Sequence, residues 1–142
     1  MEEHRSKTIL IIENDDSLMH LLQALFQDAG FKTYCVQHVD DIFALVEHSN
    51  PDVILLDYLL PGINGGELCA QLKREPSTRQ IPVVICSAYP QVMLSLGNYG
   101  CNAFIAKPFE IDDMIFQVED CLKNPEKAFT GKLVKVGKYL AD

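Results

Sequence analysis

Short apolar runs recur along the chain, and each gives way to polar or turn-forming residues. Four of them cover residues 9–12, 53–56, 82–86 and 103–106, and residues 32–36 form a fifth, weaker candidate. The four runs are continuously apolar rather than alternating, which is typical of strands buried on both faces of a parallel sheet. The pattern therefore predicts five strands.

Apolar residues at helical spacing fill the intervals between these strands. The first helix has Leu18, Leu21, Leu22, Leu25 and Ala29 on its inner face, Asp15, Asp16 or Ser17 as its N-cap, and Gly30 at its end. Further helices are expected before Pro51, over residues 67–74, and between Pro90 and Tyr99, where glycines lower the helix propensity. The last helix has Ile111, Met114, Ile115, Val118 and Leu122 on one face.

The regular alternation of strand and helix predicts an α/β fold. Parallel strands joined by helices need those helices on both faces of the sheet. Five strands and five helices favour the flavodoxin-like, doubly wound sheet with strand order 2-1-3-4-5.

Composition narrows the function classes. The chain has 142 residues, which suits one domain, and 48% of them are hydrophobic, enough for a core. A formal net charge of −8 argues against nucleic-acid binding, which needs a basic face. The longest apolar stretch, residues 53–60, is too short to span a membrane. The five scattered cysteines make a poor disulfide framework, so we expect a cytoplasmic protein.

Polar side chains stand where four of the predicted strands end. They are Glu13 and Asn14 after the first strand, Asp57 after the third, Ser87 after the fourth and Lys107 after the fifth. Because parallel strands share a carboxyl edge, and ligands bind there, we expect these groups to meet in one pocket.

These groups suit phosphoryl transfer. Clustered carboxylates favour Mg²⁺, with Mn²⁺ as a second candidate, because hard cations take oxygen ligands. The carboxylate of Asp57 can attack phosphorus and form an acyl phosphate. Ser87 can donate a hydrogen bond to the phosphoryl group, and Lys107 can neutralise its charge.

Four motifs carry a resemblance to the receiver domains of response regulators, in particular single-domain, chemotaxis-type regulators of two-component signalling. They are I-L-I-I-E-N-D-D at 9–16, D-Y-L-L-P-G-I-N-G at 57–65, V-V-I-C-S-A at 83–88 and F-I-A-K-P-F at 104–109. The resemblance covers residues 7–123. It rests on the order and spacing of all four motifs, since each one alone is weak.

The resemblance implies a role for each residue of the pocket. Asp57 is the phosphoacceptor, Ser87 the switch hydroxyl, and Phe104 the aromatic that turns inward when the hydroxyl moves toward the phosphoryl group. Lys107 is the family lysine, joined to Pro108 by a cis bond. The implied Mg²⁺ ligands are Glu13, Asn14, Asp57 and the backbone carbonyl of Leu59, and Tyr89 and Leu59 tune the lifetime of the phosphoryl group. Two bulky groups at those positions lead us to expect slow hydrolysis.

Asn14 departs from the family pattern, which has an acidic metal ligand at this position. An amide keeps an oxygen ligand but loses a charge, so we expect weaker Mg²⁺ binding. Asp15 is a candidate to compensate, although Glu13 to Asp16 can also be read as a helix-capping run.

The domain boundaries follow from the extent of the resemblance. We expect a receiver domain over residues 1–124 and a basic tail over 125–142, without an output domain. The tail contains F-T-G-K-L-V-K-V, which alternates enough for a short strand or an extended arm. A solvated extension, a docking segment for a partner or a second copy, and a linker to a missing output domain all remain open.

The leading hypothesis is a switch that a histidine kinase or phosphotransfer protein phosphorylates and that then binds a downstream protein. It catalyses only its own phosphoryl transfer and hydrolysis, so we do not class it as an enzyme. We expect no nucleic-acid or membrane partner, and a homodimer stays open. The alternatives are a degenerate receiver that binds partners without phosphorylation, which Asn14 favours, and an aspartyl phosphatase, which the missing D-x-D motif disfavours.

Overall fold

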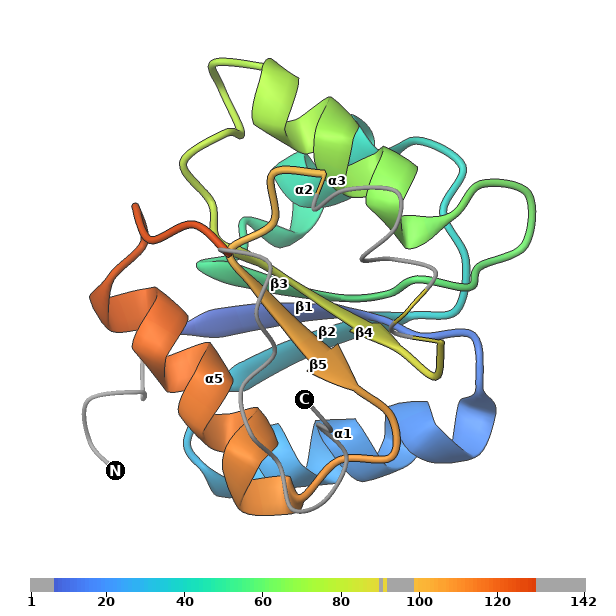
Figure 1. The fold of residues 1–142 in the computed structure, drawn as a ribbon, viewed down its shortest axis with the longest axis vertical. Helices are drawn as coiled ribbons and strands as arrows, with labels where there is room; N and C mark the ends of the chain where they lie inside the picture. The colour runs from blue at the N-terminus through green and yellow to red at the C-terminus, as the bar shows by residue number, and fades with distance from the viewer. Residues whose placement is uncertain (1–6, 90, 92–98, 130–142) are drawn as a thin grey trace.

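The computed structural model describes residues 7–89, 91 and 99–129 and shows a central sheet between two layers of helices (Figure 1). In chain order the elements are β1 (Thr8–Ile12), α1 (Asp16–Asp28), β2 (Lys32–Val36), α2 (Ile42–Ser49), β3 (Val53–Asp57), α3 (Gly65–Arg74), β4 (Val83–Ser87), β5 (Ala103–Ala106) and α5 (Ile111–Lys123). The helix expected between Pro90 and Tyr99 lies outside the described residues except for residue 91, so the labels pass from α3 to α5.

The sheet has five strands in the order β2-β1-β3-β4-β5, and every neighbouring pair is parallel. This confirms the predicted fold class, strand order and strand positions. Helices α1 and α5 cover one face of the sheet, and α2 and α3 cover the other (Figure 1).

Residues of each central strand point alternately into two separate cores. Leu10 and Ile12 of β1 join the core under α2 and α3, whereas Ile9 and Ile11 join the core under α1 and α5. All four are fully buried. The continuous apolar runs of the sequence reflect this double coverage.

Side-chain caps mark the starts of α1, α2 and α3. Asp15 is the N-cap of α1, its carboxylate accepting from the backbone N–H of Leu18 at 3.0 Å, while Asp16 is the first residue of the helix. Asp41 and Asn64 cap α2 and α3 in the same way. Such caps are favoured because the first N–H groups of a helix have no partner within it.

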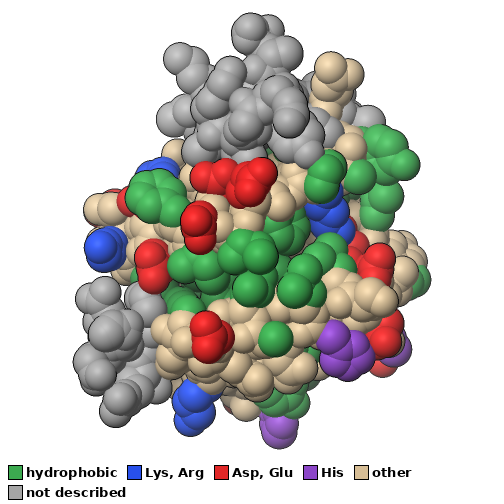
Figure 2. Space-filling model, turned by 90° about the horizontal axis from the view of Figure 1, so that it is seen from below, with side chains coloured by type: hydrophobic (Ala, Val, Ile, Leu, Met, Phe, Trp, Pro, Cys, Tyr) green, Lys and Arg blue, Asp and Glu red, His purple; other side chains and the backbone are tan. Residues whose placement is uncertain are grey.

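Two positions expected on the inner faces of helices are exposed instead. The side chain of Leu21 in α1 is 47% exposed, and Ile111 at the start of α5 is 46% exposed. Phe26 takes the central buried position of α1 together with Leu22. Leu21 and Ile111 instead line one surface groove together with Leu18 and Phe109. Figure 2, which views the molecule from the side of α1 and α5, shows hydrophobic side chains at the surface.

Candidate functional site

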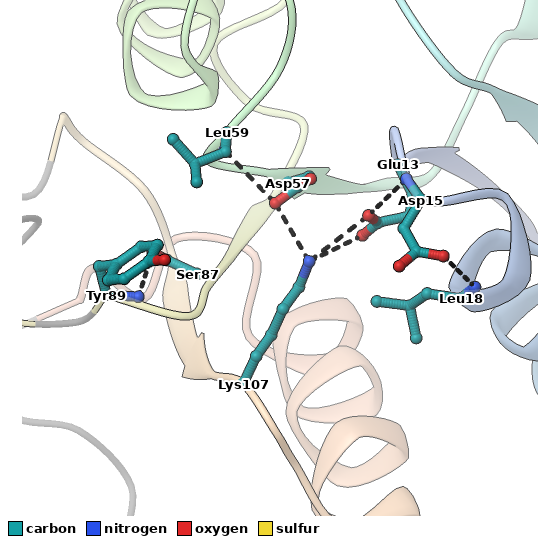
Figure 3. A network of polar contacts seen from close by, with 8 residues as sticks. All are labelled: Glu13, Asp15, Leu18, Asp57, Leu59, Ser87, Tyr89 and Lys107. Carbon is teal, nitrogen blue, oxygen red and sulfur yellow. Dashed lines mark hydrogen bonds and ion pairs between the residues drawn. The ribbon is translucent and has the colours of Figure 1, made fainter.

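The carboxyl ends of four strands gather the polar side chains that the sequence singled out. Glu13 follows β1, Asp57 ends β3, Ser87 ends β4 and Lys107 follows β5. The parallel register aligns these ends, since Ser87 pairs with Ala106, the residue before Lys107. The expected convergence is therefore present (Figure 3).

Lys107 joins the two buried carboxylates of this site. Its Nζ lies 3.2 Å from Glu13 Oε1 and 3.2 Å from Asp57 Oδ1, and it also donates to Glu13 Oε2 at 3.4 Å. Glu13 is only 3% exposed and Asp57 7%. An ion pair with so little access to water is screened weakly, so the lysine fixes both carboxylates in place.

Burial and charge act in opposite directions on this cluster. Burial raises the pKa of the Glu13 carboxyl, and the N–H of Asp15, which donates to Glu13 Oε2 at 3.1 Å, opposes that rise. For Lys107, burial alone lowers the pKa, but the carboxylates of Glu13 and Asp57 outweigh it, and the net direction is upward. Lys107 therefore stays charged at neutral pH.

The donors at this site suit a hard cation. Two buried carboxylates and one ammonium sum to a charge of −1 when all are ionised, and the carboxylates offer oxygen ligands. Within residues 7–89, 91 and 99–129 no cluster of three or more His, Cys, Asp or Glu side chains is placed to hold a metal. Mg²⁺ usually takes only one or two carboxylates and keeps several waters, so the pair Glu13 and Asp57 fits it.

The two residues that follow Glu13, Asn14 and Asp15, have different surroundings. Asn14, which follows Glu13 in the chain, is exposed. One oxygen of Asp15 caps α1, and Figure 3 shows its carboxylate turned toward Leu18 rather than toward Asp57. The helix cap therefore uses one oxygen of Asp15, and Asn14 is the third side chain that the resemblance implied as a ligand.

Ser87 lies on the opposite side of Asp57 from Glu13 (Figure 3). It is 1% exposed, and its hydroxyl accepts from the backbone N–H of Tyr89 at 2.9 Å. Its backbone carbonyl accepts from the N–H of Lys107 at 2.8 Å, which ties the switch candidate to the lysine.

The two side chains expected to tune the phosphoryl lifetime stand at the surface. Leu59 is 53% exposed and Tyr89 is 57% exposed. The backbone N–H of Leu59 faces Asp57 Oδ1 at 3.4 Å. The bond between Lys107 and Pro108 is cis, as the resemblance implied.

Three features of the site escaped the sequence analysis. Tyr58, directly after Asp57, is buried, and its hydroxyl lies 3.1 Å from that of Tyr99. Gly65 packs so closely on β3 that an added Cβ would lie 2.2 Å from the carbonyl oxygen of Asp57. Phe104 is buried against Phe129, with ring centroids 6.0 Å apart. The N-G-G sequence at residues 64–66 indicates a turn at Gly65. The Tyr58–Tyr99 and Phe104–Phe129 pairs join distant segments, so neither is indicated by the local sequence.

Comparison with known proteins identifies the class. Residues 9–119 match the family described as response regulator receiver domain, and the chain belongs to that family. This confirms the resemblance drawn from the four motifs.

Two relatives of this chain differ in how much of their own length it spans. The phosphate regulon regulatory protein PhoB of Rhizobium meliloti is 24% identical over 94% of this chain, and the chain spans only 60% of PhoB. The polar-differentiation response regulator DivK of Brucella ovis is 28% identical over 82% of this chain and 97% of DivK.

A solved receiver domain shares the fold. The receiver of the sensor histidine kinase PA1611 from Pseudomonas aeruginosa, described with a magnesium ion in its active-site cleft, superposes with a TM-score of 0.75. It is 19% identical and covers 83% of this chain and 98% of that one.

Proposed function

We propose that this chain is the receiver of a two-component phosphorelay and that it accepts a phosphoryl group on Asp57. One observation carries the proposal: the carboxylate of Asp57 ends a buried strand and is held by Lys107 at 3.2 Å, beside Glu13. A strand-end carboxylate used only for capping would not need a partly buried lysine shared with a second carboxylate.

The chemistry follows from this arrangement. An Asp57 oxygen attacks the phosphorus of a phosphohistidine, forming a C–O–P linkage as the P–N bond breaks, and the imidazole leaves with the electron pair and takes up a proton. Lys107 then pairs with the charge of the phosphoryl oxygens, and Ser87 donates its hydroxyl proton to one of them. The donor is a histidine kinase or a phosphotransfer protein.

Glu13, Asp57, the Leu59 carbonyl and Asn14 would hold Mg²⁺, with Mn²⁺ as a substitute. The ion supplies charge neutralisation for the incoming phosphoryl group. The receiver with magnesium among the structural relatives supports this assignment. Because Asn14 carries no charge, we propose a lower affinity than an acidic residue would give.

Switching follows from the movement of Ser87 toward the phosphoryl group. That movement breaks its hydrogen bond from the N–H of Tyr89 and favours the inward position of Phe104. The shifted population presents a surface for a downstream protein. In this proposal the chain catalyses only its own phosphoryl transfer and hydrolysis, and Tyr89 and Leu59 set the rate of hydrolysis.

The chain spans 97% of DivK, and within the chain we propose residues 1–124 as the receiver domain and 125–142 as a basic tail. PhoB, of which the chain spans 60%, leaves a longer regulator as the competing arrangement. The five cysteines are free, which suits a cytoplasmic location. The described residues contain no helix long and apolar enough to cross a membrane.

The experiment is a Mg²⁺ titration followed by amide NMR, and then intact mass after incubation with acetyl phosphate. We expect Mg²⁺ binding and one added phosphoryl group in the wild type, and no added group in Asp57→Asn. Mg²⁺ binding without phosphorylation, or persistent phosphorylation of the variant, would favour the degenerate receiver or another acceptor.

A further inference from the structure

The chain turns back on the domain after α5. Residues 124–129, here called the C-terminal strap, run from the end of α5 to the start of β5 (Figure 1). The N–H of Phe129 donates to the carbonyl of Cys101 at 3.0 Å, and Lys127 forms an ion pair with Asp120. Residues 130–142 lie outside the described residues.

Asn102 anchors the strap from inside the fold. Its side-chain N–H groups donate to the carbonyls of Pro125 at 3.1 Å and Lys127 at 2.7 Å. Its Oδ1 accepts from the N–H of Val83, at the start of β4, at 2.9 Å. Asn102 is only 5% exposed, so these bonds form away from water and tie the strap to the strands beneath it.

The strap ends on the aromatic ring that the proposed switch uses. Phe129 is 7% exposed and belongs to the same core as Phe104, which is 2% exposed. Their ring centroids are 6.0 Å apart, at an interplanar angle of 46°. Phe104 is thus in an inward, buried position, and Phe129 packs beside it.

β5 connects the strap to the phosphorylation site. The strand has four residues, with Asn102 directly before it and Lys107 directly after it. Phe104 lies between them and pairs with Ile85 of β4. An outward turn of Phe104 would remove the ring against which Phe129 packs, so the ring and the strap are expected to move together.

We propose that the C-terminal strap is an intramolecular clamp that holds Phe104 inward and thereby favours the phosphorylated form of the switch. The inference rests on the proposed function, in which the inward ring accompanies phosphorylation. In this proposal the C-terminal strap is an intramolecular binding partner of β5, the strand that carries Phe104. A target protein that docks beside β5 would meet the strap there.

The clamp is tested through the affinity for beryllofluoride, an unreactive mimic of the phosphoryl group, in the presence of Mg²⁺. Two-dimensional NMR titrations compare the full-length wild type, Phe129→Ala and the matched control Phe116→Ala, whose ring on α5 is 59% exposed. Coupling between two sites usually amounts to 5-fold or more. We therefore expect Phe129→Ala to bind at least about 5-fold more weakly, and Phe116→Ala to bind like the wild type.

A second measurement uses the wild type alone and does not depend on how well a variant folds. Because coupling is reciprocal, saturating beryllofluoride should slow hydrogen exchange at the amide of Phe129 by a similar factor. Equal affinities in all three proteins, or an unchanged exchange rate, would overturn the clamp and leave the proposed function standing. A wild type that binds no beryllofluoride would refute the proposed function, and the clamp with it.

Discussion

Replacing Lys107 with methionine tests the charge cluster on which the site is built. The substitution keeps most of the apolar stem but removes the ammonium that lies 3.2 Å from both Glu13 and Asp57. Two buried carboxylates then face each other without a counter-ion.

The size of the effect follows from these distances. A pair of unit charges 3.2 Å apart attracts by about 5 kcal/mol at an effective dielectric of about 20. Desolvation offsets much of that, and breaking buried ion pairs typically costs about 3–5 kcal/mol. Because the Lys107 side chain is still 18% exposed, we take the lower end of this range. We expect the free energy of unfolding to fall by about 3 kcal/mol at pH 7.5.

The loss of stability caused by Lys107→Met should become smaller as the pH falls. Burial already raises the pKa of Glu13 above its usual value of 4.5, and removing Lys107 raises it further. A carboxyl with a raised folded-state pKa takes up its proton in the folded state first. Stability therefore increases as the pH falls from neutral through that pKa toward 4.5.

The assay is urea unfolding in EDTA at pH 7.5 and pH 5, with Lys32→Met as a control because Lys32 is exposed on β2. We expect a loss below about 0.5 kcal/mol in the control. Equal losses for the two variants, or a Lys107→Met loss that does not change with pH, would refute the reasoning.

Three other substitutions have defined outcomes. Tyr58→Phe removes the hydrogen bond that is the main cause of the raised pKa of Tyr99, and ultraviolet titration should show that pKa falling from about 12 toward 10; no change would exclude the contact. Gly65→Ala should destabilise by about 3 kcal/mol in urea unfolding, since its Cβ meets the Asp57 carbonyl at 2.2 Å, and a neutral effect would contradict that packing. Asn102→Ala leaves buried partners unpaired and should cost about 2–4 kcal/mol, whereas a cost below 1 kcal/mol would show that the strap is not anchored there.

The sheet and its site could be predicted because their signals are local. A strand buried on both faces is apolar along most of its length, so β1, β3, β4 and β5 can be recognised from their sequences. Once the strands are parallel, their carboxyl ends have to share one edge. Asp57 and Lys107, 50 residues apart, could be brought together on that argument alone.

The remaining contacts depend on chain segments that meet only after folding. Phe129 begins a tail whose alternation predicted a strand or an extended arm, and nothing in that pattern indicated that its ring is buried beside Phe104. Tyr58 and Tyr99 are 41 residues apart, and nothing near either one indicates the other. Leu21 fits the helical stripe of α1, but whether such a residue is covered depends on neighbours that the stripe does not specify.

The central claim is that Asp57 becomes phosphorylated, and trapping the acyl phosphate tests it most directly. The chain is incubated with acetyl phosphate and Mg²⁺ and reduced with borohydride, which converts an aspartyl phosphate to homoserine, and the peptides are read by tandem mass spectrometry. The account predicts homoserine at position 57, dependent on Mg²⁺ and on the phosphodonor. A reduced residue elsewhere, such as at Asp15, or none in a chain shown to be folded, would contradict it.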